Sequence, residues 1–297
     1  MPAHRLSLCK SHYIQWFETY TRRAIDKFEM IQTHEKVMVA VSGGKDSLAL
    51  WHLLAGLGYE TVGFYIELGI PDQGYSSNSQ LKAQSFAEKI GQKLVIARVE
   101  EEMGAGIPEI SKSTYRKTCS VCGLSKRHLM NRAAMDEGVD VLATGHNLDD
   151  ETASLFGNMI NWDIGYLGKQ SPVLAENAVG LRKKIKPFCY FTEKQVAMYA
   201  LLSGIDYLQQ DCPHSVTATS LRYKEILNQM EHQSPGMKRR FFDRYLQNQG
   251  LFQAEQTQPE LRPCARCGMP TSIEVCSYCK TVERAKCHSR ESGNPVG

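Results

Sequence analysis

A short apolar run followed at once by a glycine turn and a helix-like segment is the feature that most restricts the fold of this chain. The run is Val37–Val41, the turn is Ser42-Gly43-Gly44, and the helix-like segment is Ser47–Leu57. Continuous apolar runs of this length are typical of strands that are buried on both faces of a parallel sheet. The segment therefore predicts a buried strand, a tight turn and a helix packed on the sheet.

The same alternation continues along the first half of the chain. Further strand-like segments are Thr61–Ile66, Leu94–Val99 and Val139–Thr144, and further helix-like segments are Tyr13–Phe28, Ser79–Ile90, Ser125–Glu137 and Leu148–Ile160. Strands that alternate with helices form a parallel sheet with helices on both faces. We therefore expect an α/β fold with a doubly wound parallel sheet, preceded by an N-terminal helix.

Changes in pattern divide the chain into five expected parts. They are an N-terminal helical segment (1–35), a domain built on the sheet (36–210), a helical basic region (211–252), a small four-cysteine unit (263–281) and a disordered tail (282–297). Two stretches without a clear period, Glu101–Cys122 and Asn161–Val179, are expected to be insertions. A capping box at Thr192–Gln195 predicts one more helix, which runs to Leu202.

The composition excludes several classes of protein. With 42% hydrophobic and 23% charged residues, the chain is globular rather than disordered, collagen-like or coiled-coil. The stretch Ser47–Tyr59 falls short of the roughly 18 apolar residues that a membrane span needs. No secretory signal is readable before the first helix, so we expect a cytoplasmic protein without a membrane segment.

The turn Ser42–Ser47 has the chemistry of a phosphate-binding loop. Gly43 and Gly44 allow backbone N–H groups to approach a ligand closely, and the start of the next helix adds free N–H groups and the positive end of its dipole. It is not a Walker A loop, because that pattern needs a glycine where Val39 stands. An ordinary glycine-rich turn is the alternative, and the flanking serine hydroxyls favour phosphate binding.

The cysteines favour metal binding over disulfides, because the chain is long and no export signal is readable. Six of the ten form three C-x-x-C pairs, which are Cys119/Cys122, Cys264/Cys267 and Cys276/Cys279. The last two pairs are eight residues apart and are expected to hold Zn2+ as a small ribbon. A unit of roughly 20 residues cannot bury a core unaided, so the metal would supply its folding energy.

The loop Ser42-Gly43-Gly44-Lys45-Asp46-Ser47 resembles the fingerprint of the PP-loop ATP pyrophosphatase superfamily, the adenine nucleotide alpha hydrolase type. A second match, Gly145-His146-Asn147-Leu148-Asp149-Asp150, follows the strand-like segment Val139–Thr144. Ligands of doubly wound sheets bind at the carboxyl ends of strands, so both segments are expected at one site. The resemblance implies that residues 36–210 bind ATP, cleave it between the α- and β-phosphates and transfer AMP to an oxygen of the substrate.

The resemblance also implies roles for single residues. Asp46 and Asp150 are expected to bind Mg2+ or to orient the substrate, and Lys126, on the first turn of the expected helix Ser125–Glu137, to contact ATP and assist the reaction. The full set of expected ATP-binding positions is Ala40, Ser42, Gly43, Gly44, Ser47, Ile66, Lys126 and Gly145. The alternatives are an acid pair that satisfies a helix dipole for Asp149 and Asp150, and a solvated lysine for Lys126.

A third match is Cys119-Ser-Val-Cys122, which together with Cys212 resembles the tRNA 2-thiolation branch of the superfamily. The resemblance implies that these three cysteines hold a 4Fe-4S cluster at the active site and leave one iron without a protein ligand, where an exogenous sulfur could bind. A dithiol redox pair and a third zinc site are the alternatives. Members of the zinc-bearing group carry an N-terminal C-x-x-C pair followed by C-x-x-H. This sequence shows only the second part, Cys9-Lys-Ser-His12, so we predict no metal site there.

The implied activity is that of a tRNA sulfurtransferase: ATP-dependent 2-thiolation of tRNA, with a uridine as the expected base. The base C2 oxygen would be adenylated, and sulfur would then displace AMP at the cluster. Expected partners are tRNA and a sulfur donor (a carrier protein, a cysteine desulfurase relay or free sulfide), and a homodimer is left open. The alternatives are another PP-loop ligase or amidotransferase-type enzyme, and a zinc-ribbon RNA-binding protein with a vestigial nucleotide site.

Basic clusters along a chain of net charge +3 suit transient contact with RNA phosphates. The clusters are Arg116/Lys117, Lys126/Arg127, Arg182/Lys183/Lys184/Lys186, Arg222/Lys224 and Lys238/Arg239/Arg240. Each run taken alone is equally typical of a solvated surface.

Overall fold

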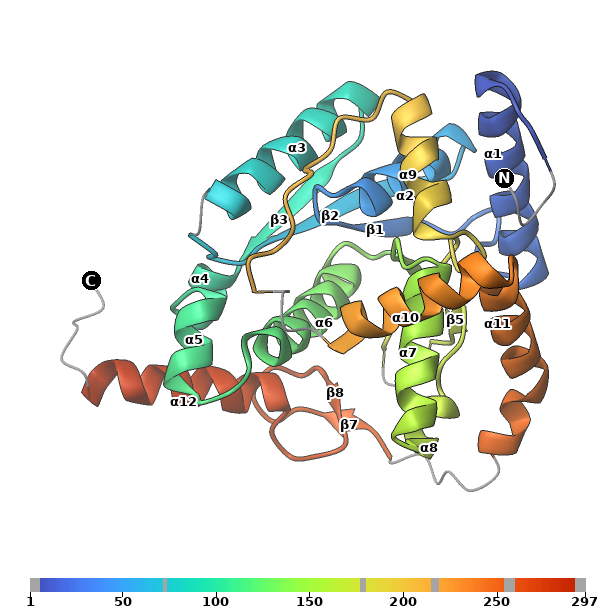
Figure 1. Cartoon of the computed structure of the whole chain (residues 1–297). Coiled ribbons are helices and arrows are strands. Elements are labelled where there is room, and N and C mark those ends of the chain that lie inside the picture. The colour runs from blue at the N-terminus through green and yellow to red at the C-terminus, as the bar shows by residue number, and fades with distance from the viewer. Residues whose placement is uncertain (1–5, 72–73, 177–179, 215–218, 254–259, 292–297) are drawn as a thin grey trace.

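The computed structural model describes residues 6–71, 74–176, 180–214, 219–253 and 260–291, with residues 287–291 described by their backbone alone. A six-stranded sheet, in the order β3-β2-β1-β4-β6-β5, crosses its centre, and helices cover both faces (Figure 1). All neighbouring strands are parallel except β5, which is antiparallel to β6. The predicted doubly wound parallel sheet is therefore confirmed, with one antiparallel edge strand added.

The strands of this sheet are short. They are β1 (Val37–Val41), β2 (Thr61–Glu67), β3 (Leu94–Arg98), β4 (Val141–Ala143), β5 (Val173–Leu174) and β6 (Lys183–Ile185). Strands β7 (Arg262–Pro263) and β8 (Pro270–Thr271) form a separate antiparallel pair near the C-terminal end. Because β1 lies between β2 and β4, the chain direction across the sheet reverses between β1 and β4. That reversal is the topological switch point where open α/β sheets bind ligands.

Most helices lie where the sequence predicts them. Those of the sheet domain are α1 (Lys10–Lys27), α2 (Lys45–Gly56), α3 (Tyr75–Ile90), α6 (Thr118–Asp136), α7 (Leu148–Ile160) and α9 (Glu193–Leu202). The others are α4 (Val99–Met103), α5 (Ile107–Ser113), α8 (Ile164–Leu167), α10 (Thr219–Gln233), α11 (Met237–Asn248), the 3-10 turn η3 (Gln249–Phe252) and α12 (Ser277–Glu291). No helix among the described residues is long and apolar enough to cross a membrane.

The core fixes α2 on the sheet through one large ring. Trp51 of α2 is fully buried, and its indole N–H donates to the Thr61 hydroxyl at 3.1 Å. Gly63 of β2 lies directly beneath the ring, where a Cβ atom would stand 2.3 Å from Trp51 Cη2. Since α2 begins at the predicted phosphate loop, this contact also fixes the position of that loop.

The two stretches expected to be insertions contain helices and a strand that their sequence pattern did not predict. The expected insertion Glu101–Cys122 is mostly helical, because Ile107, Ile110 and Val121 are buried and hold α5 and α6 against the sheet. In the second expected insertion, α8 and β5 form, and β5 pairs with the unpredicted strand β6. Residues 177–179 of that stretch lie outside the described residues.

The expected disordered tail is also corrected as far as the structure describes it. Helix α12 runs from Ser277 to Glu291, and Thr281 and Ala285 on it are buried. Its contacts with α4, α5 and α6 explain why a segment without an apolar period is helical. Residues 292–297 lie outside the described residues, as do residues 254–259 of the expected linker.

The Trp51 contact predicts an asymmetric response to two glycine substitutions. Gly63→Ala should lower the free energy of unfolding by about 1–3 kcal/mol, because its methyl group overpacks the core. Gly56→Ala, at the end of α2, is the control, because its Cβ meets no atom within 4 Å. Thermal and urea unfolding of both variants would measure the difference, and equal stability of the two would contradict the proposed packing.

Candidate functional site

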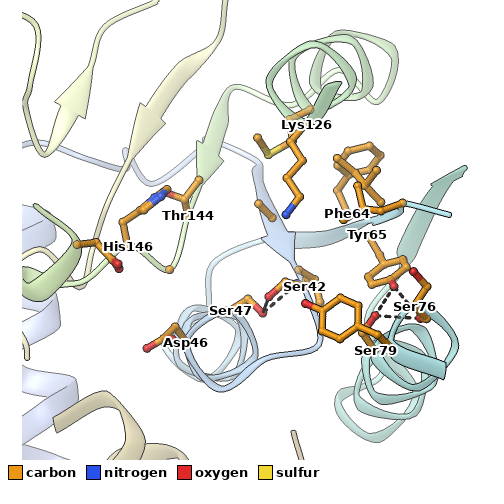
Figure 2. Close-up of a pocket in the computed structure, with 18 residues that line it drawn as sticks. Ser42, Asp46, Ser47, Phe64, Tyr65, Ser76, Ser79, Lys126, Thr144 and His146 are labelled. Carbon is orange, nitrogen blue, oxygen red and sulfur yellow. Dashed lines mark hydrogen bonds between the residues drawn. The ribbon is translucent and has the colours of Figure 1, made fainter. Parts of the chain in front are cut away.

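A cavity of about 290 Å3 lies at the switch point, at the carboxyl ends of β1, β2 and β4 (Figure 2). Its lining includes most of the residues predicted to bind ATP, namely Ala40, Ser42, Ser47, Ile66, Lys126 and Gly145, together with Asp46 and Asp150. Apolar walls come from Phe64, Leu68 and Met130, and a hydroxyl-bearing wall from Tyr65, Ser76 and Ser79. One end of the cavity is thus apolar and suits a nucleoside, while the turn at the other end is polar.

The glycine turn has the local structure of an anion cradle. Gly43 has φ +75°, and a Cβ there would stand 2.4 Å from the Ser79 carbonyl oxygen, so the position requires glycine. The hydroxyls of Ser42 and Ser47 lie 3.2 Å apart, and Ser47 also accepts from the Ser42 backbone N–H at 3.0 Å. The N-cap residue of α2 is Gly44, which has no side chain to cap the helix, so N–H groups of the first turn remain available to a ligand.

Two contacts hold this turn against its neighbours. A Cβ on Gly145 would stand 2.9 Å from the backbone carbonyl of Asp46, so a glycine there lets the β4–α7 loop approach the start of α2. On the other side, the Leu208 N–H donates to the Gly43 carbonyl at 2.9 Å. The turn is therefore held from both sides by segments that are distant in the sequence.

The acid pair that follows β4 is divided between two tasks. Asp149 is buried, and its carboxylate binds Lys238 Nζ at 2.6 Å and the Glu193 N–H at 2.9 Å. Asp150 lines the cavity instead and closes the capping box of α7 with Asn147. Asn147 also donates to Asp46 at 3.3 Å, which links the two matched segments. Asp150 is thus available to a ligand, whereas Asp149 holds the surrounding helices together.

Burial and a like charge raise the pKa of one acid of the cavity, Asp46. Burial raises the pKa of Asp46, Lys45 only partly offsets this, and the charge of Asp150 adds to it. A divalent cation between the two carboxylates would remove that penalty, because it replaces repulsion with a shared opposite charge.

Two lysines and a glutamate of this site were missed by the sequence analysis. Lys45 Nζ lies 2.8 Å from Glu193 and 3.1 Å from Asp46, and Lys224 Nζ lies 2.6 Å from Asp150 and 3.3 Å from Glu193. Burial opposes the charge of each lysine, but the carboxylates outweigh it and raise both pKa values. The sequence analysis grouped Lys224 with the basic clusters suited to RNA. Its ion pairs with Asp150 and Glu193, which are distant in the sequence, show that it belongs to this site.

Lys238 also departs from its predicted role. It was grouped with residues suited to RNA phosphates, yet only 1% of its side chain is exposed, and it is paired with Asp149. It is therefore a structural cation, although its neighbours Arg239 and Arg240 remain partly exposed.

The three predicted cluster cysteines lie near one another beside the cavity. Cys119 and Cys122 lie in the first turns of α6, and the Cys119 thiol contacts the His214 carbonyl at 3.4 Å, two residues beyond Cys212. Burial raises the pKa of Cys122, Lys126 opposes the rise, and the charges of Cys212 and Cys119 add to it. Lys126, which lines the cavity, is thus also the neighbour of the thiols.

This arrangement corrects the expected position of Lys126 and fits a polynuclear group. Helix α6 begins at Thr118, so Lys126 lies on its third turn rather than on its first. The thiols of Cys119, Cys122 and Cys212 are not among the sets whose ligand atoms all lie within 4.8 Å of one another, so they are too spread for one ion. A cluster of several irons separates its thiolate ligands more widely than one ion does, so this spread is compatible with the 4Fe-4S group that the resemblance implies.

In the part of the chain that the structure describes, the four C-terminal cysteines form a set that could hold a single metal ion. The sulfur atoms of Cys264, Cys267, Cys276 and Cys279 all lie within 4.8 Å of one another. Burial opposes ionisation of Cys264, but N–H groups of Cys276 and Arg266 outweigh it and lower its pKa to about 6. Four convergent sulfurs on two tight turns match a closed, tetrahedral structural site.

This four-cysteine unit packs on the helix that carries Cys119, Cys122 and Lys126. The ring of Tyr278, between two of the four cysteines, stacks on His128 of α6 with centroids 3.7 Å apart and an interplanar angle of 7°. Burial and the charge of Arg132 lower the pKa of His128 to about 4, so this ring is neutral near pH 7.

The N-terminal remnant does not form a metal site within the described residues. The Cys9 thiol lies 3.1 Å from His12 Nδ1, but no third ligand joins them in the part of the chain that the structure describes.

Comparisons with known proteins place this geometry in a family. The PP-loop domain family matches residues 17–217. The chain is 47% identical to the tRNA-5-methyluridine(54) 2-sulfurtransferase of Thermus thermophilus, over 94% of this chain and 86% of that protein. It is 40% identical to the Pyrococcus horikoshii protein of the same name, over 93% and 87%.

A solved structure agrees with these relatives. The U34-tRNA thiolase NcsA from Methanococcus maripaludis, described with its 4Fe-4S cluster, superposes with a TM-score of 0.78 at 26% identity, over 97% of this chain and 91% of that one. The chain therefore belongs to the PP-loop domain family and, within it, to the tRNA 2-thiolation sulfurtransferases.

Proposed function

We propose that this protein thiolates C2 of a tRNA uridine at the expense of ATP. The observation that carries the proposal is one residue, Lys126, which lines the nucleotide cavity and also neighbours the Cys122 thiol. A nucleotide-cleaving enzyme that uses nitrogen as its nucleophile has no use for three thiols beside its phosphate loop. A vestigial nucleotide site would not need the glycine-specific contacts at Gly43 and Gly145.

In the first step, the C2 oxygen of the base attacks the α-phosphorus of ATP, and pyrophosphate leaves. The free N–H groups at the start of α2 and the hydroxyls of Ser42 and Ser47 would bind the phosphates. Asp46 and Asp150 would hold Mg2+, which takes few protein carboxylates together with phosphate oxygens. Lys126 would offset the charge that develops on the transferred phosphoryl group.

Ala40 and Ile66 would contact the adenine nucleoside on the apolar side of the cavity. These assignments agree with an AMP moiety that lies between the sheet edge and α6.

In the second step, sulfur attacks C2 and AMP leaves, which restores the neutral base. Adenylation makes this step feasible because AMP leaves readily, whereas a carbonyl oxygen does not. A 4Fe-4S cluster held by Cys119, Cys122 and Cys212 would supply an iron site for the incoming sulfur. The chain itself would position the base beside Lys126 and near these three thiols.

The remaining partners follow from the same reaction. The substrate would be tRNA in the cytoplasm, as the name of the yeast relative, cytoplasmic tRNA 2-thiolation protein 1, suggests. A sulfur donor must supply the incoming atom, and the four C-terminal cysteines would bind Zn2+ with a structural role. Assembly as a homodimer stays a prediction.

The two neighbouring acids should respond in opposite ways to substitution. Asp150→Asn should reduce tRNA thiolation about 100-fold or more, because it removes a ligand-facing charge. It should cost about 1 kcal/mol of stability or less, because its ion pair with Lys224 is partly exposed and is screened by solvent. Asp149→Asn should instead cost about 3 kcal/mol or more of stability, because buried Lys238 loses its opposite charge. The two variants would be compared by thiouridine content of tRNA and by thermal unfolding. If Asp149→Asn lost thiolation without losing stability and Asp150→Asn lost stability without losing thiolation, Asp149 rather than Asp150 would be the acid that faces the ligand.

Loss of one cluster ligand should remove iron. Cys212→Ala, purified without oxygen, should lose the visible absorbance of the cluster and most of its iron. Cys189→Ala is the matched control, because Cys189 is fully buried in the core away from these thiols and should keep both. Full iron content in the Cys212 variant would show that the ligand set is wrong.

The C-terminal site should behave as a structural one. Cys264→Ser should lower the zinc content and make α12 sensitive to limited proteolysis, because the metal supplies the folding energy of the unit. Ser277→Ala, an exposed change between Cys276 and Cys279 of the same unit, should keep one zinc per chain. An unchanged zinc content in the Cys264 variant would contradict the zinc assignment.

A further inference from the structure

A second cavity, of about 180 Å3, lies between α1, the loop before α9 and α11. Helices α1 and α11 lie on the same side of the molecule (Figure 1). Its lining combines aromatic rings with cations and includes Trp16, Tyr20, Tyr190, Arg23, Lys27 and Arg239. It shares no lining residue with the nucleotide cavity, so it is a separate site.

The cations of this cavity are not balanced by its walls, since no lining residue is acidic. Arg239 pairs with Asp243 at 2.7 Å, whereas Arg23 and Lys27 form no ion pair within the described residues. Lys27 donates to the Tyr190 hydroxyl at 2.8 Å and lies near the faces of the Tyr190 and Phe28 rings, so it is held by neutral groups rather than by a carboxylate. Positive charge that converges on an apolar hollow favours an anionic ligand.

The aromatic groups indicate what kind of anion fits. The Arg239 guanidinium lies over the Tyr190 ring, 3.2 Å from its centroid, and Arg23 lies 4.9 Å from the centroid of Tyr20. Tyr20 is 40% exposed, although it is a large ring. Unstacked nucleobases bind to aromatic rings and guanidinium planes in this way. The volume is below the roughly 300 Å3 of cavities that enclose whole small ligands, so one flat ring would enter and its phosphate would stay at the rim.

One wall of the cavity is hydrogen-bonded to the start of α7, the helix that carries Asp150. The Phe191 carbonyl, in its wall, accepts from the Leu148 N–H at 2.8 Å, at the beginning of α7. Arg239 follows Lys238, which binds Asp149. One RNA strand could therefore contact this cavity and present another nucleotide to the catalytic site.

We propose that this cavity binds an unstacked nucleotide of the tRNA substrate outside the catalytic site. The base lies against Tyr20 and Arg239, and Arg23 and Lys27 bind its phosphate. This inference rests on the proposed function, because it names where that enzyme holds RNA. A peptide carboxylate would use the cations but not the ring faces, so RNA is the better match.

The test measures binding of transcribed tRNA to the full-length, anaerobically purified protein by fluorescence anisotropy. Tyr20→Ala should weaken binding about five-fold or more, as loss of one stacked base does. Arg23→Gln should weaken it too and reduce the slope of log affinity against log salt by about one. Arg22→Gln, a neighbouring exposed charge that does not line the cavity, should bind like wild type. ATP affinity should stay unchanged in all three.

The outcomes separate this inference from the proposed function. If wild type thiolates tRNA but Tyr20→Ala and Arg23→Gln bind it as tightly as wild type, the cavity is not an RNA site and only this inference fails. It fails in the same way if these variants keep tRNA affinity but lose affinity for a peptide that ends in a free carboxylate. If the wild-type protein neither binds nor thiolates tRNA, the proposed function fails and the inference falls with it.

Discussion

The fold of the site depends on the close approach of two turns that leave adjacent parallel strands. Strands β1 and β4 pair directly, and glycine at position 145 lets the second turn touch the backbone at Asp46. Any side chain there would push the two turns apart, because the space is filled by main chain that cannot yield. The phosphate-binding N–H groups of one turn and the Asp150 carboxylate of the other therefore share a single cavity, and the proposed chemistry requires both.

Compensated charge is the second principle of this site. Asp46, Asp150 and Glu193 are partly buried, and such a group of acids would be costly if it stood alone. Lys45 and Lys224 balance it and tie α2, α7, α9 and α10 together. The neighbouring pair Asp149–Lys238 is nearly dry and joins α7 to α11. These ion pairs add to the apolar packing of the same helices and fix the positions of their charged groups around the cavity.

Local signals in the sequence predicted what local chemistry determines. The Val37–Val41 strand, helix α7 and the Thr192 capping box occur as predicted, since periodicity and capping residues determine each of them. Strand β6, with the sequence Lys-Lys-Ile, carries no strand signal and exists because β4 offers it an edge. Lys224 and Glu193 escaped notice for a similar reason, because their role arises only where four helices meet. Helix α12 shows the same limit, since it is stabilised by its neighbours.

The hydrogen bond from the Leu208 N–H to the Gly43 carbonyl connects the phosphate turn to the segment that carries Cys212. Only residues 209–211 separate Leu208 from Cys212 along the chain. The segment that holds the phosphate turn is therefore also the segment that places the Cys212 thiol. In the proposed reaction, with Cys212 as a cluster ligand, a movement of the phosphate turn on nucleotide binding would reach that ligand through a few residues of main chain.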